Sequence, residues 1–136
     1  MTNHQLEFIT THTYPDRDEG ITLPVLLGFG GKTVSIEAKV DTGAGLCLFR
    51  REHGEKLGLD IESGEHIVLD TLAGSLEAYG HEVTLQSCGI AFQSFVYFAR
   101  YPGLRRNILG LRGWFRNMRV GIVDYDHTIY LSRYDD

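Results

Sequence analysis

The sequence is poor in several residue types that would place it in a well-defined class. It has only two cysteines and three prolines among 136 residues, so it lacks the cysteine density of a small disulfide-stabilised secreted domain. No apolar run reaches the roughly 18 residues that a membrane-spanning helix needs. Residues 1–13 contain neither the basic nor the apolar segment of a secretion signal. We therefore expect a cytoplasmic protein that does not bind membranes.

Positive charge is scarce as well. The 13 Lys and Arg residues are outnumbered by 18 Asp and Glu residues, and the formal net charge is -5. This balance argues against a nucleic-acid partner, because phosphate backbones are bound by concentrated Lys and Arg. One local cluster of arginines is interrupted by apolar residues and glycines, and we interpret it as a solvated rim rather than a phosphate site. Its members are Arg105, Arg106, Arg112, Arg116 and Arg119.

The pattern of histidines and cysteines predicts no metal and no cofactor. Four histidines in the chain share no spacing typical of a metal site: His53, His66, His81 and His127. The acidic residues at 124–127 are better explained as a turn between two strands. Cys47 lies in an apolar segment without a neighbouring base, so we expect a small buried residue and not a nucleophile.

The residues that are abundant favour a mainly β fold. Hydrophobic residues make up 43% of the chain, which is enough for a core, and there are seven Tyr, seven Phe and 16 Gly. Aromatic residues suit pleated surfaces and glycines suit tight turns. We expect residues 1–20 to form an N-terminal arm and loop, in which residues 6–9 are either an edge strand or loosely ordered. Residues 21–136 are expected to form a single domain.

Hydrophobic periodicity divides this domain into short strands that recur about every ten residues, as in a closed β-barrel or a sandwich. Two short helices are expected, at residues 50–57 and 111–115. The expected strands are residues 23–29, 33–40, 46–49, 65–71, 75–85, 90–99, 118–123 and 128–131.

The strand at residues 33–40 leads directly into Asp41, Thr42, Gly43 and Ala44. Two interpretations are open from these residues alone. Asp-Thr-Gly is ordinary turn chemistry, because Asp and Thr side chains bind nearby amides and Gly permits the bend. The same order also holds a carboxylate at the end of a rigid strand, which is typical of an active-site turn.

Two further segments contribute to the functional interpretation. The hairpin of residues 65–85 has a tip of small residues, Thr71, Leu72, Ala73, Gly74 and Ser75, and we place Glu77 and Glu82 on its solvated face. The second segment is apolar and ends in glycine. It consists of Ile108, Leu109 and Gly110.

In this order, the three segments resemble the retropepsin-like aspartic proteases, and bacterial single-domain members in particular, over about residues 23–131. The resemblance implies a closed acid-protease-type β-barrel that is one protomer of a homodimer. It assigns catalysis to a pair of Asp41 carboxyls, one from each protomer, which would share a proton and activate water. Thr42, Gly43 and Ala44 would support the site, and the hairpin tip would be a flap over an extended peptide or protein substrate.

The chain also departs from retroviral members of that group. Those members carry an acidic residue and an arginine, forming an ion pair near the subunit interface, where this chain has Gly45 and Leu111. Since both partners are replaced together, no buried charge is left alone, and we expect a repacked interface. Two other functions stay open, namely a non-catalytic retropepsin-fold module that binds peptides or proteins, and a small-ligand β-barrel in which Asp41 is a turn residue.

Overall fold

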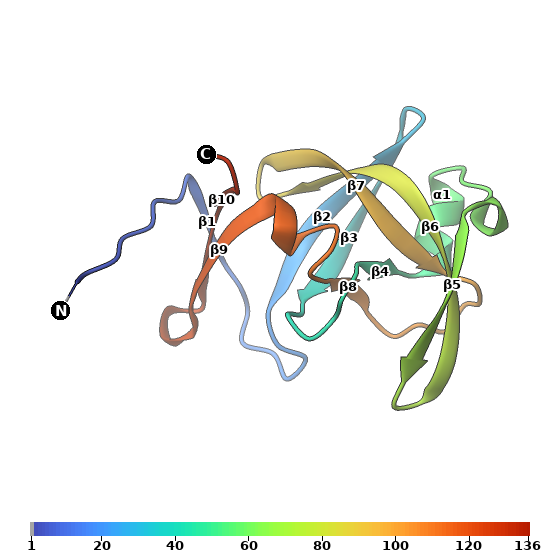
Figure 1. The fold of residues 1–136 in the computed structure, drawn as a ribbon, viewed down its shortest axis with the longest axis horizontal. Helices are drawn as coiled ribbons and strands as arrows, with labels where there is room; N and C mark the ends of the chain where they lie inside the picture. Colours follow the sequence, from blue (N-terminus) through green and yellow to red (C-terminus); the bar gives the residue numbers. More distant parts are fainter. Residues whose placement is uncertain (1) are drawn as a thin grey trace.

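The computed structural model describes residues 2–136, and β-strands dominate it (Figure 1). No helix in this described part is long and apolar enough to cross a membrane. The strands are β1 Thr10–Thr13, β2 Thr22–Phe29, β3 Lys32–Val40, β4 Leu48–Phe49, β5 Glu65–Thr71, β6 Gly74–Ser87, β7 Ile90–Ala99, β8 Asn107–Leu109, β9 Met118–Val123 and β10 Thr128–Arg133. The α-helix is α1 Arg51–Lys56, and the 3-10 helices are η1 Ile61–Ser63, η2 Phe115–Asn117 and η3 Asp124–Asp126.

Six of these strands close into a barrel. Hydrogen-bonded neighbours follow the order β2-β3-β8-β4-β7-β6, and β6 pairs in turn with β2 through the register Val25↔Ser87 to Gly28↔Thr84. The remaining strand of this sheet, β5, pairs only with β6 and extends away from the barrel (Figure 1). The expected mainly β, closed-barrel fold with short helices is therefore confirmed.

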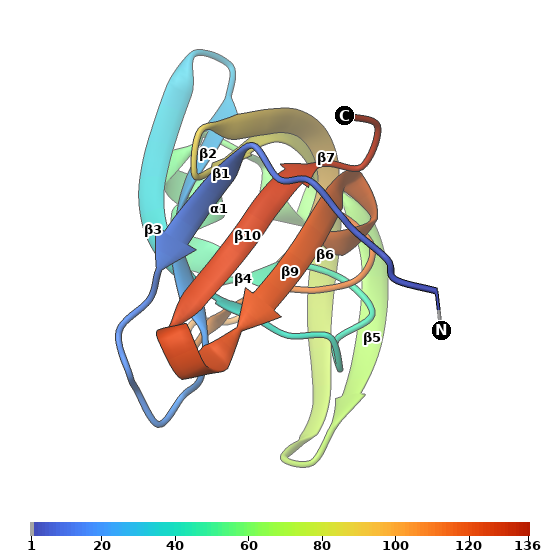
Figure 2. The ribbon, with the colours of Figure 1, turned by 90° about the vertical axis from the view of Figure 1, so that its left-hand side faces the viewer.

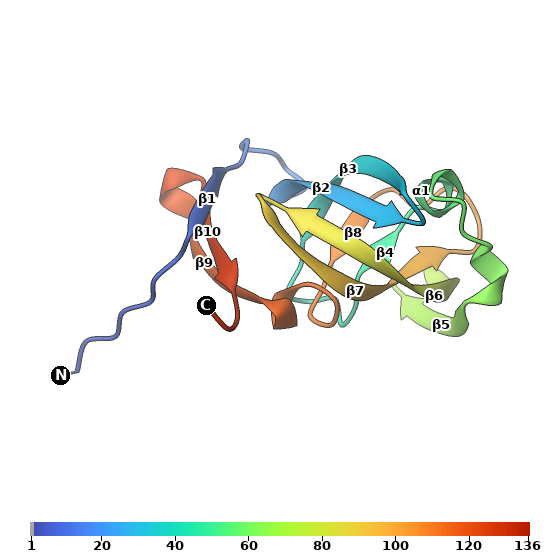
Figure 3. The same ribbon diagram turned by 90° about the horizontal axis from the view of Figure 1, so that it is seen from above.

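A second, three-stranded sheet in the order β1-β10-β9 lies beside the barrel. Figure 2 views this sheet face on, and Figure 3 shows it at the end of the barrel opposite to α1. Of the two alternatives for residues 6–9, the edge strand is excluded, because the N-terminal strand is Thr10–Thr13 and pairs with β10. The Ile9 side chain stays largely exposed, and its amide bonds to the Leu131 carbonyl at 3.1 Å and to Ser132 Oγ at 2.8 Å.

The alternating pattern of the strands builds the core. In β3, for example, Val34, Ile36, Ala38 and Val40 point inward and the residues between them are more exposed. Trp114 is fully buried, and its indole nitrogen donates a hydrogen bond to Ser87 Oγ at 3.1 Å. One large apolar cluster, which contains this satisfied indole N–H, joins the barrel to the second sheet through Ile129 and Leu131 of β10.

The secondary structure near Trp114 also differs from the one expected from the sequence. A short helix was expected at residues 111–115, but the helical turn is η2, Phe115–Asn117. Gly113 has φ +100°, a left-handed conformation that an α-helix cannot contain. The helix expected at residues 50–57 is confirmed as α1, and the strands expected at 90–99 and 118–123 have the bounds of β7 and β9.

We expect Ser87→Ala to lower the free energy of unfolding by about 1–3 kcal/mol, because it leaves the buried Trp114 indole N–H without an acceptor. Ser35→Ala is the matched control, since Ser35 is an exposed residue of β3 and should change stability by less than about 0.5 kcal/mol. Urea unfolding followed by tryptophan fluorescence measures both variants. Equal stability of the two variants would contradict the importance of the Ser87–Trp114 hydrogen bond.

Candidate active site

Asp41 follows the last residue of β3, at the point where β3 pairs in parallel with β8. Val40 is the partner of Leu109 in this register, and the Asp41 amide donates to the Leu109 carbonyl at 3.0 Å. Parallel strands end at the same edge of a sheet. The structure therefore brings together two of the three segments that the sequence marked, although they are far apart in the chain.

The turn after Asp41 fixes the orientation of its carboxylate. Gly43 donates its amide to Asp41 Oδ1 at 2.8 Å, and the Ala44 amide donates to the Asp41 carbonyl at 3.2 Å. Asp41 and Ala44 are half-buried, whereas Thr42 and Gly43 are exposed. The carboxylate is thus held by its own turn and lies at the surface of the protomer.

Main-chain hydrogen bonds also join the two segments beyond Asp41. Leu111 donates its amide to the Ala44 carbonyl at 2.9 Å, and Arg112 donates to the Gly45 carbonyl at 3.1 Å. Gly45 and Leu111 are the positions at which retroviral members carry the ion pair. In this chain, main-chain hydrogen bonds connect the two segments at these positions, where neither Gly45 nor Leu111 can form an ion pair.

Gly110 is required by this close approach of the two segments. A Cβ atom built on Gly110 would lie 2.0 Å from the Leu46 carbonyl oxygen and 2.7 Å from that of Ala44. Both contacts are with backbone atoms, which cannot rotate away as a flexible side chain could. Residue 110 must therefore be glycine for the backbone to pack this closely against the residues that follow the Asp41 turn.

The expected flap is the long hairpin of β5 and β6. Thr71 pairs with Gly74, and Leu72 and Ala73 form the turn between them. Thr71 Oγ1 accepts a hydrogen bond from the Ala73 amide at 3.2 Å and donates one to the Gly74 carbonyl at 2.6 Å. Gly74 has φ +114°, which favours glycine. Leu72 is fully exposed at the tip, so a large apolar side chain here faces solvent in the protomer.

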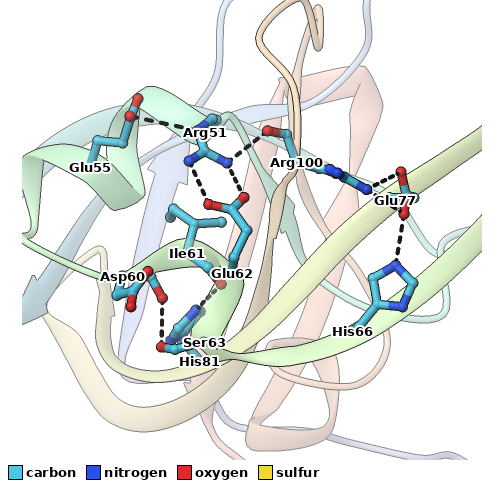
Figure 4. Close-up of polar contacts among 10 residues, drawn as sticks. All are labelled: Arg51, Glu55, Asp60, Ile61, Glu62, Ser63, His66, Glu77, His81 and Arg100. Atoms are coloured by element: carbon cyan, nitrogen blue, oxygen red, sulfur yellow. Dashed lines mark hydrogen bonds and ion pairs between the residues drawn. The ribbon is translucent and has the colours of Figure 1, made fainter.

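Charged side chains connect the base of this hairpin to the barrel (Figure 4). Arg100, which directly follows β7, donates to both carboxylate oxygens of Glu77 at 2.9 Å, and His66 Nε2 lies 3.0 Å from Glu77 Oε1. Hydrogen bonds from His66 and Arg100 lower the pKa of Glu77. Glu77 keeps 32% of its side chain exposed, and its carboxylate also joins both strands of the flap to the end of β7. Glu82 is exposed as expected.

A second set of contacts extends the same network to α1 and η1 (Figure 4). Arg51 binds both oxygens of Glu62, at 2.5 and 2.8 Å, and donates to the Arg100 carbonyl at 2.7 Å. Glu55, one turn along α1, lies 3.6 Å from the Arg51 guanidinium. The sequence analysis did not reveal the contacts of Arg51 with Glu62 and Arg100, because these residues lie 11 and 49 positions apart from Arg51 and no motif marks them.

A cavity of about 950 Å³ lies between the flap and the segment that precedes β8. Its lining is mostly apolar, with charged side chains at its margin: Val68, Thr71, Ala73, Ser75, Leu76, Glu77, Ala99, Tyr101, Pro102, Gly103, Leu104, Arg105, Arg106 and Ile108. Asp41 and Ala44 do not line this cavity in the single protomer. They lie close to it in the fold, because Ile108 is followed by Leu109, whose carbonyl binds the Asp41 amide.

Within residues 2–136, no three or more His, Cys, Asp and Glu side chains form a group that could hold a metal ion. Cys47 is fully buried, and desolvation raises the pKa of its thiol to about 12. It is therefore protonated at neutral pH, in agreement with the core role expected from its sequence context.

Comparisons with known proteins agree with this geometry. The family model for aspartyl proteases matches residues 24–112, a range that includes Asp41, the flap and Gly110. A retropepsin-like aspartic protease from Rickettsia conorii is similar in structure, with 20% identity, a TM-score of 0.64 and coverage of 94% of this chain and 100% of that chain. The EIAV protease, complexed with the inhibitor HBY-793, has 21% identity and a TM-score of 0.53 over 69% of this chain and 84% of that chain. Curated proteins gave no match.

We expect Gly110→Ala to displace the Asp41 turn and to destabilise the protein by about 1–3 kcal/mol or more, the range typical of overpacked interiors. Gly28→Ala serves as the control, because a Cβ on Gly28 would meet its nearest neighbour at an ordinary 3.6 Å. Thermal unfolding measures stability, and amide chemical shifts of Asp41, Gly43 and Ala44 report the turn. Unchanged shifts and stability in Gly110→Ala would contradict the close packing described here.

Proposed function

Because the chain belongs to the aspartyl protease family and has a retropepsin-like fold, we propose that it is an aspartic endopeptidase whose active site is completed by two copies of the chain. Each copy contributes Asp41. The observation that carries the proposal is the position of this carboxylate, which is fixed by Gly43 at the end of β3 and lies at the protomer surface.

The chemistry requires two carboxyl groups with different protonation. Hydrolysis of a peptide bond needs one group that takes a proton from water and another that gives a proton to the substrate carbonyl. Two carboxylates held close together share one proton, because both cannot be charged at that distance. A pair of Asp41 residues meets this requirement without a covalent intermediate.

Symmetry supplies the second carboxyl. Among the described residues, the hydrogen bond to the Asp41 carboxylate comes from Gly43 in its own turn, and no acidic side chain of the same chain is bonded to it. Thr42 and Gly43 are exposed in the protomer. An isologous contact about a two-fold axis would bury these residues and would place one Asp41 beside the other.

The flap and the cavity beneath it support a peptide substrate. The cavity is lined largely by apolar side chains and is bounded on one side by residues of the β5–β6 hairpin. An extended peptide could pair with strand edges while its side chains occupy apolar pockets. Leu72 at the exposed tip would then cover the peptide and exclude water from the Asp41 pair.

We expect Asp41→Asn to abolish peptide hydrolysis and to leave a folded dimer, because the amide keeps the shape of the turn but cannot exchange the proton. A fall of at least about 100- to 10,000-fold is the range for loss of a general acid–base group. Asp126→Asn, which alters an exposed turn carboxylate in η3, is the control and should retain activity. Cleavage of a fluorogenic peptide library at mildly acidic and neutral pH measures the rates, and sedimentation velocity measures the assembly.

The outcomes separate the possible functions. Substantial hydrolysis by Asp41→Asn would sink the catalytic assignment. A strictly monomeric wild-type protein that binds peptides but leaves them intact would instead favour the non-catalytic peptide-binding module.

Leu72→Ala tests the role of the flap tip. The side chain is fully exposed in the protomer, so we expect little change in stability. If it packs on bound peptide, its loss should reduce kcat/KM about 10- to 100-fold, since burying a leucine contributes about 1.5–3 kcal/mol. Ile122→Ala is the control, because Ile122 is a partly exposed apolar residue of β9. An equal effect of both substitutions on kcat/KM would argue against a flap function for Leu72.

A further inference from the structure

The long hairpin of β5 and β6 changes from three strands to two along its length. β6 pairs with β7 as far as the register Ala78↔Ala99, where β7 ends. Beyond that point, the residues of β6 from Glu77 to Gly74 pair with no strand other than β5. A two-stranded hairpin has little stability of its own in water. The outer part of the flap therefore depends on contacts made where the third strand ends.

Backbone packing becomes looser along the same hairpin. At its base, a Cβ atom built on Gly80 would overlap the Phe95 ring, and one built on Gly64 would overlap the Gly80 carbonyl oxygen. At its tip, a Cβ atom built on Gly74 would meet nothing within 4 Å, and the Leu72 side chain is fully exposed. The base of the hairpin is thus fixed by close contacts that the tip does not have.

Glu77 lies at the junction of these two parts and is bonded to Arg100 through both its main chain and its side chain. The Glu77 carbonyl accepts a hydrogen bond from the Arg100 amide at 2.9 Å. The Glu77 carboxylate accepts from Arg100 Nη1, which lies 2.9 Å from each of its oxygens. Arg100 directly follows β7, so these contacts attach β6 to the barrel at the point where strand pairing stops.

The same carboxylate also reaches the other strand of the flap. His66 Nε2 in β5 lies 3.0 Å from Glu77 Oε1. Because a charged carboxylate only accepts hydrogen bonds, Nε2 carries the proton in this contact. Hydrogen bonds from His66 and Arg100 lower the pKa of Glu77, so the carboxylate stays charged in mildly acidic solution. Both strands of the flap are therefore joined to one guanidinium.

Arg100 is in turn held by the body of the protein. Its carbonyl accepts a hydrogen bond from Arg51 Nη1 of α1 at 2.7 Å, and Arg51 is itself bound by both carboxylate oxygens of Glu62 in η1. The Arg100 guanidinium lies 5.1 Å from the centre of the Tyr101 ring, a cation–π contact. Figure 4 shows the resulting path of contacts from α1 to the two strands of the flap.

The opposite face of the flap is apolar. Neighbouring residues of a strand point to opposite faces, so the side chains next to His66 and Glu77 in sequence lie on the other face. There, Ile67, Leu69 and Leu76 pack against a small cluster of Leu46, Leu48 and Ala78. Apolar burial has no preferred direction, whereas hydrogen bonds depend on angle. The charged face is therefore the one that can fix the angle of the flap.

We propose that Glu77 and Arg100 are positioning residues, whose contact sets the angle of the flap above the cavity and holds it there before a peptide binds. Glu77 supplies the only carboxylate among the residues that line this cavity. A flap that is already in place loses less conformational entropy when it closes on a peptide. The effect on catalysis rests on the proposed protease function, whereas the effect on the mobility of the flap does not.

Amide hydrogen exchange measures the mobility of the flap without a substrate. In Glu77→Gln, the amides of residues 68–76 should exchange about two- to fivefold faster than in the wild type, the effect of losing one partly exposed ion pair. Exchange reports local opening of a segment, so the amides of β7 should not change. Glu82→Gln is the matched control, because Glu82 is an exposed residue of the same strand; it should behave as the wild type.

Peptide cleavage measures the positioning role. Glu77→Gln and Arg100→Gln should each raise KM about two- to fivefold and leave kcat within about twofold, because binding lost equally from substrate and transition state changes KM alone. Arg100→Lys should recover most of this loss. Arg100 uses a single nitrogen for both carboxylate oxygens, and an ammonium group can supply such a point contact.

The double variant Glu77→Gln/Arg100→Gln tests whether the two residues act through each other. If they do, the double variant should show no faster flap exchange and no higher KM than either single variant. Additive effects would overturn the proposal. Unchanged flap exchange in Glu77→Gln would do the same, as would faster exchange with an unchanged KM, or equal effects of Glu77→Gln and Glu82→Gln.

The two functions fail in distinguishable ways. If the wild-type protein cleaves no peptide, the proposed protease function is wrong, and the exchange rates of the flap still decide whether Glu77 and Arg100 hold it in place. If the wild type cleaves peptides and the variants behave as the wild type in both measurements, the protease function stands and the positioning role is wrong.

Discussion

The parallel pairing of β3 with β8 is the contact on which the rest of the candidate site depends. It places Val40 beside Leu109 and lets the Leu109 carbonyl receive the Asp41 amide. The following residues continue the connection through main-chain bonds from Leu111 and Arg112. Because Gly110 has no side chain, the two backbones can approach closely enough to make these bonds. Within β8, the adjacent residues Asn107 and Ile108 line two different cavities.

The sequence predicted those parts of the fold that depend on local pattern. Period-2 alternation identified β3, whose alternate residues face the core. The aromatic and β-branched residues of β7 identified that strand. The sequence-based assignment failed at two places, where a backbone conformation or a distant pairing partner decides the element. Gly113, in a left-handed conformation, delays the helical turn to η2, and the pairing partner of the N-terminal segment in β10 shifts the first strand to Thr10–Thr13.

Some residues of the candidate site could be recognised from the sequence, and others could not. Asp41, the flap and Gly110 could be recognised because their chemistry depends on a few adjacent residues. The network of Arg51, Glu62, Arg100 and Glu77 could not, since each ion pair forms between residues that only the folded chain brings together.

Because β2 pairs with β6, the barrel has few strand edges at which another chain could pair. A strand that has neighbours on both sides cannot accept a further strand, and in the described part the closed ring leaves few open edges: β5 in the larger sheet, and β1 and β9 in the smaller one. Exposed apolar residues lie on two of these strands, Val68 on β5 and Ile122 and Val123 on β9. Edge-to-edge strand pairing between copies, which can also start aggregation, is therefore expected at β5 and at the edges of the three-stranded sheet. The strands of the closed barrel are protected from it.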